Sequence, residues 1–434
     1  MLTIHHQLLP RDIYLSKLKS FQDCEPVKVV TGIRRCGKSS LLALMREHLL
    51  ASGIAREQIL SINFESIQYN TMSVADVCNF VHGHVLPGRR LYLFLDELQR
   101  LEGWENAVNS FRVDLDCDIY ITGSNACLLS SEYSTYLAGR YVEIRMLPLS
   151  FREFLLFHGF TVKESRLGTG RHSVFTRDGE ALTLEEAFSL YLRYGGMPGL
   201  VDSGLEQERS LILLEGLYNT VVFRDILRRP GEGQLRNPAL LEKIILFLAD
   251  NIGNTTSLRT ICNTLASEDL MQARNKNGKP ATQTVAAYVN ALLQTYLFYE
   301  VKRFDLKGKE LLRTLGKYYM VDMGLRNFLL GYRDTDTGHI LENIVYFELL
   351  RRGYAVTIGK IGDKEIDFIA IRDREKIYYQ VTMDMDDPKT RERELAPLRA
   401  VQDNYEKVVL TLRTLSTAPA DGIKIVPLLD FLLQ

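Results

Sequence analysis

The sequence predicts an α/β protein with a parallel-sheet core, a helical and winged-helix middle region, and a C-terminal α/β domain. Two observations carry this expectation. Short runs of apolar and β-branched residues alternate with amphipathic stretches over residues 1–200, and four strand-like runs return in the last hundred residues. A chain of 434 residues also exceeds one ordinary core, which indicates two or three domains.

The first part alternates strands with helices. Apolar runs predict buried strands at residues 26–30, 59–64, 91–95 and 118–122, and helical spacing predicts helices at 39–50 and 103–115. Residues 159–182 are polar and indicate a surface excursion. A helix then begins at the capping box formed by Thr183 and Glu186, and it stops at Gly195 and Gly196.

The rest of the chain changes character twice. Residues 238–265 fit two short helices and 282–297 a third, followed by a strand–turn–strand, which is the order of a winged helix. A helix at 341–353 and four strand-like runs then indicate a separate α/β domain. We therefore expect boundaries that give residues 1–200, 201–335 and 336–434.

Composition excludes several classes of protein. With 46% apolar and 25% charged residues the chain is globular in composition, and its net charge of −1 gives no hint of a nucleic-acid or membrane partner. No apolar run approaches the roughly 20 residues that cross a bilayer, and the start lacks the pattern of a secretory signal. The six cysteines form no C-x-x-C pair, so we expect reduced thiols, a cytoplasmic protein and no membrane association.

A phosphate-binding loop follows the first predicted strand. Residues Gly32 to Ser39 fill the pattern G-x-x-x-x-G-K-[ST]. The glycines allow successive N–H groups to face phosphates, Lys38 reaches the β- and γ-phosphates, and the Ser39 hydroxyl ligates Mg²⁺. The pattern predicts ATP and Mg²⁺ as cofactors. The expected nucleotide-binding residues are Gly32, Ile33, Arg34, Arg35, Cys36, Gly37, Lys38, Ser39 and Ser40.

An acidic pair supplies the second half of this site. The run 91–95 delivers Asp96 and Glu97 to the carboxyl end of a strand, about 60 residues after the loop. Asp96 is expected to hold Mg²⁺ through water, and Glu97 to activate the attacking water as general base.

Two further residues are candidates for the reaction. Asn125 follows the next strand and is expected to sense the γ-phosphate, with Ser124 as second choice; the alternative is an Asn that caps a helix. Arg140 is a candidate finger that acts on a neighbouring subunit, with a surface salt bridge as the alternative.

These motifs resemble a known family. The segments GIRRCGKSSLL, LFLDELQ, ITGSNACLL, AGRYVEIRMLPLSFREF, GGMP at 195–198 and FRDILRR at 223–229 resemble the prokaryotic AAA-family ATPases that carry a C-terminal domain of unknown function numbered 4143 (DUF4143). The resemblance implies an AAA+ ATPase core with a helical lid, a winged helix, a restriction-endonuclease-like C-terminal domain, and a homo-oligomer, expected to be a hexamer.

Nuclease-like domains of that kind hold Mg²⁺ on acidic residues and position water with a lysine. Here Glu342 lies on the predicted helix, with Glu348 as second choice, while Asp367 and Gln380 lie on successive strands. Thr382 stands where the lysine is expected. Lys360 and Lys364 are the substitutes considered. The domain is therefore expected to be degenerate and to bind DNA or partners; an active nuclease and a purely structural domain are the alternatives.

A local excess of positive charge favours DNA as partner. Residues 256–317 carry ten basic and five acidic side chains, a balance of +5. A solvated charged face is the alternative. The basic side chains are Arg259, Arg274, Lys276, Lys279, Lys302, Arg303, Lys307, Lys309, Arg313 and Lys317.

Three functions follow as hypotheses. The first is a Mg²⁺-dependent ATPase coupled to binding or remodelling of duplex or branched DNA. The second is a nucleotide-switched signalling or scaffold ATPase that binds a protein. The third is an ATP-gated, Mg²⁺-dependent nuclease.

Overall fold

The computed structural model describes residues 8–126, 139–165, 172–177, 180–227, 237–267, 282–308, 310–333, 337–414 and 416–434. The chain forms two compact units. Unit 1 comprises Met1–Leu147 with Gln294–Tyr296, and unit 2 comprises Pro148–Leu293 with Leu297–Gln434. This division differs from the expected three parts, whose boundaries were at residues 200 and 335. No helix among the described residues is long and apolar enough to span a membrane.

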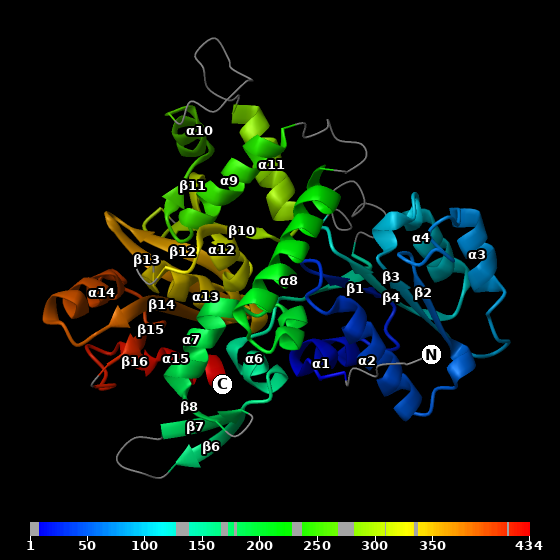
Figure 1. Ribbon diagram of the computed structural model, residues 1–434, viewed down its shortest axis with the longest axis horizontal. Helices are drawn as coiled ribbons and strands as arrows, with labels where there is room; N and C mark the ends of the chain where they lie inside the picture. Colours follow the sequence, from blue (N-terminus) through cyan, green and yellow to red (C-terminus); the bar gives the residue numbers. More distant parts are fainter. Residues whose placement is uncertain are drawn as a thin grey trace. The chain divides into compact units, whose positions relative to one another are not determined.

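Unit 1 is a five-stranded parallel sheet with helices on both faces (Figure 1). The strand order is β2-β3-β4-β1-β5. Its strands are β1 (Val27–Thr31), β2 (Ile59–Asn63), β3 (Leu91–Asp96), β4 (Cys117–Gly123) and β5 (Tyr141–Arg145). Its helices are α1 (Asp12–Ser20), α2 (Lys38–Ala51), α3 (Val74–His82) and α4 (Trp104–Asp114), with short 3₁₀ turns at Arg56–Gln58 and Leu98–Arg100.

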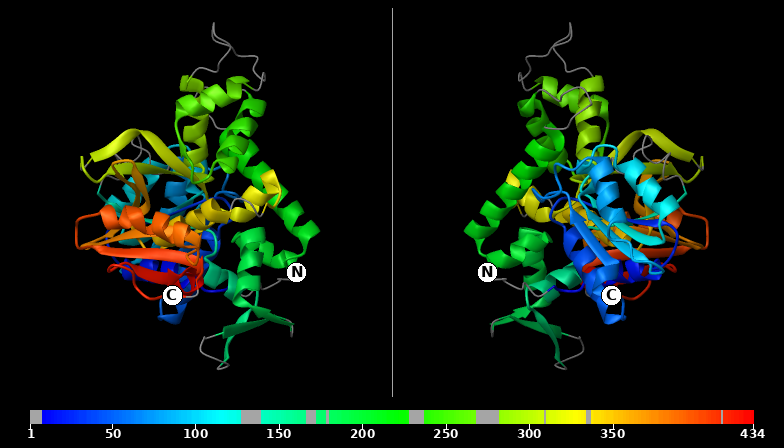
Figure 2. Two further views of the ribbon diagram at one scale, coloured as in Figure 1. Left: turned by 90° about the vertical axis from the view of Figure 1, so that its left-hand side faces the viewer. Right: turned by 90° about the vertical axis from the view of Figure 1, so that its right-hand side faces the viewer.

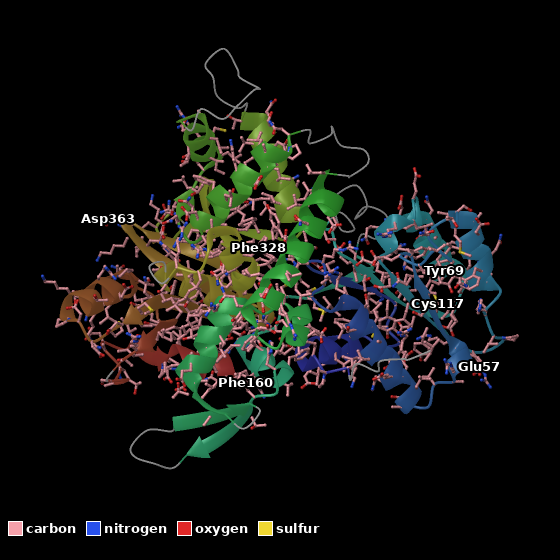
Figure 3. The ribbon with its side chains drawn as sticks, viewed as in Figure 1. Glu57, Tyr69, Cys117, Phe160, Phe328 and Asp363 are labelled. Atoms are coloured by element: carbon pink, nitrogen blue, oxygen red, sulfur yellow. The ribbon has the colours of Figure 1, made fainter. Side chains whose placement is uncertain are left out.

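Burial explains why the four predicted strands form where they do. Every residue of β1 and β3 is buried, as a strand covered by helices on both faces requires. Val77 of α3 and Phe111 of α4 pack with strand residues in one apolar cluster, which Tyr69 and Cys117 border (Figure 3). The predicted strands and the two helices of this region are therefore confirmed.

Unit 2 begins with helices and a small antiparallel sheet. Within the segment expected to be a polar surface excursion, the described residues form three strands, β6 (Thr161–Ser165), β7 (His172–Arg177) and β8 (Glu180–Thr183), which pair in a sheet of their own. The Thr183–Glu186 capping box is present at the start of α7. The helices up to residue 294 are α6 (Phe151–Phe157), α7 (Leu184–Tyr194), α8 (Gln207–Asn219), α9 (Pro238–Asp250), α10 (Leu258–Ser267) and α11 (Thr282–Gln294), with a 3₁₀ turn at Pro198–Ser203 and a π-helix at Thr220–Leu227.

An eight-stranded mixed sheet forms the rest of unit 2. Its order is β16-β15-β14-β13-β12-β10-β11-β9, and Figure 2 shows it from the yellow β10–β11 hairpin to the red β16. The strands are β9 (Thr255–Thr256), β10 (Phe298–Asp305), β11 (Glu310–Met320), β12 (Ala355–Ile361), β13 (Lys364–Arg372), β14 (Glu375–Asp384), β15 (Glu406–Arg413) and β16 (Lys424–Pro427). The remaining helices are α12 (Met323–Leu330), α13 (Thr337–Arg351), α14 (Pro388–Ala400) and α15 (Leu428–Leu433). Asp363 marks the turn between β12 and β13 (Figure 3).

The hairpin that follows the three middle helices is not a separate wing. β10 pairs antiparallel with β11, as a wing would, but it also pairs parallel with β12, with Arg303 opposite Ile358. The hydrogen bonds of one sheet therefore cross the expected boundary at residue 335. Local patterns predicted the elements correctly, but the continuity of the sheet depends on a pairing between distant segments.

The Gly-Gly pair that ends α7 has a packing role. Asp322 caps α12, and its carboxylate accepts hydrogen bonds from the backbone N–H groups of Gly196 at 2.6 Å and Leu325 at 3.1 Å. Burial raises the pKa of Asp322 to about 6, while these backbone donors oppose the rise. A Cβ atom on Gly324 would stand 2.0 Å from the carbonyl oxygen of Tyr194. The end of α7 and the start of α12 therefore approach too closely for side chains.

We expect Gly324→Ala to destabilise the protein by about 2–3 kcal/mol, because the added methyl group forces two backbone segments apart. Denaturant unfolding of the full chain measures the change. Gly338→Ala is the matched control: its Cβ atom would meet nothing within 4 Å in α13, so stability should stay equal or rise by up to about 1 kcal/mol. Equal stability of both variants would contradict the packing argument.

Candidate functional site

One edge of the unit 1 sheet gathers the residues of the predicted nucleotide site. All five strands are parallel, so their carboxyl ends meet there. The phosphate loop leaves β1, Asp96 ends β3 opposite Asn63 of β2, and Gly123 ends β4 opposite Thr31 of β1. The structure therefore brings the loop and the acidic pair to the same edge, as the sequence predicts.

The loop requires its two glycines. Gly32 has φ of 140°, and a Cβ atom there would lie 2.1 Å from the carbonyl oxygen of Met146. Gly37 has φ of 103° at the start of α2. Both angles are disfavoured for residues with side chains. The side chains of Ile33 and Cys36 are buried, so these residues offer only their backbone to a ligand; burial also raises the pKa of the Cys36 thiol.

Arg11 fastens the end of the loop, and sequence reasoning missed it. Its guanidinium is buried and donates to the carbonyl oxygens of Cys36 at 3.2 Å and Leu147 at 2.9 Å. The residue precedes α1, outside any motif, so no local signal points to it. It holds the loop through the backbone, which fixes the amides that would face phosphates.

Lys38 and the two serines begin α2. The Lys38 ammonium is buried and donates to the carbonyl oxygens of Gly32 at 3.0 Å and Ile33 at 3.1 Å. Ser39 and Ser40 are exposed in the first turn of the helix. A phosphate at this turn would meet the backbone N–H groups of the helix start and compete for the lysine.

The acidic pair is held by the neighbouring strand. Thr122 Oγ1 of β4 donates to Asp96 Oδ1 and accepts the Glu97 backbone N–H at 2.9 Å. Asn63 Nδ2 donates to Asp96 Oδ2 at 3.2 Å. Glu97 has φ of 54°, an uncommon conformation for a residue with a side chain. The backbone therefore turns sharply at the residue expected to act as base.

Two donors lie on the Glu97 carboxylate. Gln99 Nε2 lies 2.6 Å and Ser124 Oγ 3.2 Å from Glu97 Oε2. Ser124, the second choice as sensor, therefore contacts the acidic pair. Asn125 is half-buried one residue further along, and its sensing role stays a prediction. Gln99 was missed, because a glutamine two residues after an acidic pair carries no distinctive pattern.

The donor atoms suit Mg²⁺. The Ser39 hydroxyl and the Asp96 carboxylate are oxygen ligands, which this cation prefers, and phosphates and waters normally complete its shell. Ser39 is exposed, so its hydroxyl is accessible at the loop. The residues present therefore fit the ion that a bound nucleotide would bring.

Arg140 lies at the opposite end of the strands. It immediately precedes β5, and its carbonyl oxygen accepts the N–H of Val27, the first residue of β1. Its exposed side chain is therefore remote from the phosphate loop of its own chain. Action on a neighbouring subunit remains the prediction for this residue.

A second group of charged residues lies in unit 2. Lys317 of β11 is buried, and its Nζ lies 3.0 Å from both Glu342 of α13 and Glu365 of β13. The Tyr319 hydroxyl donates to Glu342 at 3.2 Å. Lys317 lowers the pKa of Glu342 against the opposing effect of burial. We call Lys317, Glu342, Glu365, Asp367 and Gln380 the charged cluster.

Asp367 and Gln380 complete the charged cluster. Asp367 accepts the Val381 backbone N–H at 2.8 Å, and burial with the nearby Glu342 charge raises the pKa of Asp367 well above its usual value. Gln380 Nε2 donates to Glu394 at 3.0 Å, whereas the buried Gln380 Oε1 has no hydrogen-bond partner. No group of three His, Cys, Asp or Glu side chains in the described part of the chain is placed to hold a metal ion.

The positive charge expected beside Gln380 is thus supplied by Lys317 of β11, a strand for which no such role was expected. Lys317 belongs to the hairpin expected to be a wing, and it provides the positive charge that Thr382 lacks. Lys364, named above as a substitute for the missing lysine, instead donates from Nζ to the carbonyl oxygen of Ala396 at 3.4 Å. Glu348 pairs with Arg351 and Arg352, so it does not join the cluster.

Two of the described basic side chains counted for the predicted basic surface are engaged in unit 2. Lys317 is buried, and Arg303 pairs with Glu365 at 3.3 Å. Arg259, Lys302 and Lys307 are exposed. Arg274, Lys276, Lys279 and Lys309 lie outside the described residues, as does the side chain of Arg313.

Comparison with known proteins supports the nucleotide-binding half of this description. A family described as "AAA domain" matches residues 25–155, and one described as "Domain of unknown function (DUF8612)" matches residues 185–336. The expected domain 4143 is therefore not the one matched. An uncharacterized protein of Haemophilus influenzae is 38% identical over 98% of this chain and 99% of its own length. Another, of Methanocaldococcus jannaschii, is 27% identical over 89% of this chain and 79% of its own length.

Solved structures give distant similarities. A Walker-type ATPase of Pyrococcus abyssi is 18% identical, with a TM-score of 0.45, over 74% of this chain and 95% of that one. The ORC1 protein of Aeropyrum pernix, solved in complex with DNA, is 11% identical, with a TM-score of 0.30, over 74% of this chain and 94% of that one.

We expect Lys317→Met to destabilise the protein by roughly 3–5 kcal/mol at pH 7.5, because it leaves Glu342 buried without its counter-charge. Without the opposing Lys317 charge, burial raises the pKa of Glu342 in the variant, so this carboxyl takes a proton as pH falls and the penalty of the buried charge disappears. The deficit should therefore shrink toward pH 4.5. Denaturant unfolding at both pH values measures it, and a deficit independent of pH would contradict the ionic explanation.

Proposed function

This chain belongs to the same protein family as the Haemophilus influenzae protein, and from that premise we propose that it is an ATPase that binds ATP with Mg²⁺ and hydrolyses it. The observation that carries the proposal is the shared sheet edge of unit 1. The Gly32–Ser39 loop, the Lys38 ammonium and the pair Asp96 and Glu97 all lie there.

The roles of the residues follow from their chemistry. Lys38 and the loop amides bind the phosphates, and Ser39 and Asp96 hold Mg²⁺, which offsets negative charge on the β- and γ-phosphates. Glu97 accepts a proton from water as the water oxygen bonds to the γ-phosphorus. The bond from that phosphorus to the bridging oxygen of ADP breaks. Gln99 and Ser124 both donate to Oε2 of Glu97, so Oε1 is the oxygen that would take the proton.

Two substitutions separate binding from hydrolysis. Lys38→Ala should weaken ATP binding by about 100-fold or more, because it removes a charged contact to the phosphates. Glu97→Gln should keep the ATP affinity but lower kcat by roughly 100- to 10,000-fold, because the amide cannot accept the proton. Calorimetry measures binding, and phosphate release measures turnover. Normal turnover by Glu97→Gln would refute the assignment of the base.

DNA is the partner that we propose for this ATPase. The support is the exposed Arg259, Lys302 and Lys307 of unit 2, which suit phosphate contacts. Duplex or branched DNA should raise kcat, and the effect should fall steeply with salt. Slow hydrolysis that ignores DNA would favour the alternative of a nucleotide-switched signalling or scaffold protein. A homo-oligomer, with a hexamer as the first expectation, would let Arg140 reach a neighbour's nucleotide.

A second candidate function is Mg²⁺-dependent cleavage of DNA in unit 2. The specific observation in its favour is Lys317, whose ammonium lies among the acids of the charged cluster. Two carboxylates, Glu342 and Asp367, and the partnerless Gln380 Oε1 are oxygen donors that suit Mg²⁺. Water would add to a phosphodiester phosphorus as one bridging P–O bond breaks and the leaving oxygen takes a proton.

Nicking of supercoiled plasmid by the purified chain tests this candidate. We expect Mg²⁺-dependent nicking that Asp367→Asn lowers by roughly 100-fold, while ATP hydrolysis continues. Glu406→Gln, which removes an exposed carboxylate paired with Lys424 on β15 and β16, is the control. Nicking that persists in Asp367→Asn would assign it to a contaminant, and no nicking by the unsubstituted chain would leave the domain without this activity.

A further inference from the structure

An ion-pair network joins the phosphate loop to the segment that follows β2. Arg34, the third residue of the loop, pairs through Nη2 with Glu65, which follows β2. The same Glu65 oxygen accepts a second guanidinium, that of Arg100, at 3.0 Å. The Arg34 side chain is only 11% exposed, although it belongs to a loop at the edge of the sheet. One carboxylate therefore holds two permanent positive charges.

The span of the Arg34–Glu65 pair shows where it lies. β1 and β2 are separated in the sheet by β4 and β3, which amounts to three strand spacings, or roughly 14 Å. Arg34 lies three residues beyond the end of β1 and Glu65 two residues beyond the end of β2, so the pair and the loops that carry it bridge the interval occupied by β4 and β3. Asp96, Glu97 and Thr122 lie at the carboxyl ends of those two strands. The pair thus spans the edge of the sheet at which the acidic residues lie.

The Glu65 end of the pair is fastened to the predicted magnesium ligand. The Glu65 backbone N–H donates to Asn63 Oδ1 at 2.8 Å, and Asn63 Nδ2 donates to Asp96 Oδ2 at 3.2 Å. Asn63 therefore joins the backbone that carries Glu65 to the carboxylate of Asp96. A change at Asp96, such as binding of a cation, reaches Glu65 through one side chain.

We propose that Arg34 binds the terminal phosphate of the nucleotide, and that Glu65 holds it in reserve while the site is empty. The inference rests on the proposed ATPase function. The terminal phosphate carries more charge than a single carboxylate and accepts the forked donors of a guanidinium at two oxygens, so it competes for Arg34. Arg100 keeps Glu65 paired after Arg34 leaves, which removes the penalty of an isolated carboxylate. ADP lacks the γ-phosphate, so Arg34 distinguishes ATP from ADP.

The ratio of ATP to ADP affinity tests the proposal. We would titrate the full chain with a fluorescent non-hydrolysable ATP analogue and with fluorescent ADP, both with Mg²⁺. Arg34→Ala should lower the affinity for the ATP analogue by about 10- to 100-fold and the affinity for ADP by less than about 2-fold. Arg34→Lys should recover part of the loss, because it keeps the charge but not the fork. Glu65→Gln should raise the affinity for the ATP analogue several-fold, because it removes the anion that competes for Arg34.

Two controls keep the test decisive. Glu25→Gln removes an exposed carboxylate that pairs with Arg112 at 3.4 Å near the start of β1, and it should leave both affinities unchanged. If Arg34→Ala fails to fold, as thermal unfolding would show, Glu65→Gln decides alone. An unchanged ratio in Arg34→Ala, or in Glu65→Gln when it stands alone, overturns the proposal.

Failure of this inference differs from failure of the proposed function. If the unsubstituted chain binds ATP, Lys38→Ala abolishes binding, and Arg34→Ala keeps the ratio, then the ATPase proposal stands and only the role of Arg34 falls. If the unsubstituted chain binds neither nucleotide, both proposals fall.

Discussion

The nucleotide site depends on the close approach of two backbone segments, Gly32 and Met146. The N–H of Met146 donates to Thr31 at the end of β1, and its carbonyl oxygen fills the space that a side chain on Gly32 would need. This contact fixes the start of the phosphate loop, while Arg11 fixes its end through Cys36. The loop is therefore ordered from both sides before any ligand arrives, which lowers the entropic cost of binding an anion.

Much of unit 1 follows from local sequence. The runs at residues 26–30, 59–64, 91–95 and 118–122 are apolar or β-prone at nearly every position, and every residue of β1 and β3 is buried. The phosphate loop and the acidic pair are equally local, because each lies within a few residues of a strand end. Arg11 and the partnership of Arg34 with Glu65 depend instead on which distant segments the sheet brings together. No pattern within a window of neighbouring residues contains that information.

Unit 2 shows the same limit more strongly. The elements of a winged helix and of a separate α/β domain are present, but β10 joins the hairpin to β12 in one sheet. That pairing carries Lys317 to the acids of α13 and β13, which lie about 25 and 50 residues further along. The positive charge that Thr382 lacks therefore comes from β11, far from Gln380 in the sequence. The charged cluster is a property of the sheet, not of any one segment.

The eight-stranded sheet also limits how copies of this chain can associate. Its outermost strands are Thr255–Thr256 and Lys424–Pro427, and the second ends in a proline, which has no backbone donor. Unpaired strand margins are templates for aggregation and for addition of a foreign strand, and short or proline-bearing margins suppress both. Self-association through the edges of this sheet would find little unpaired backbone, so an assembly built on it would rely on contacts between side chains.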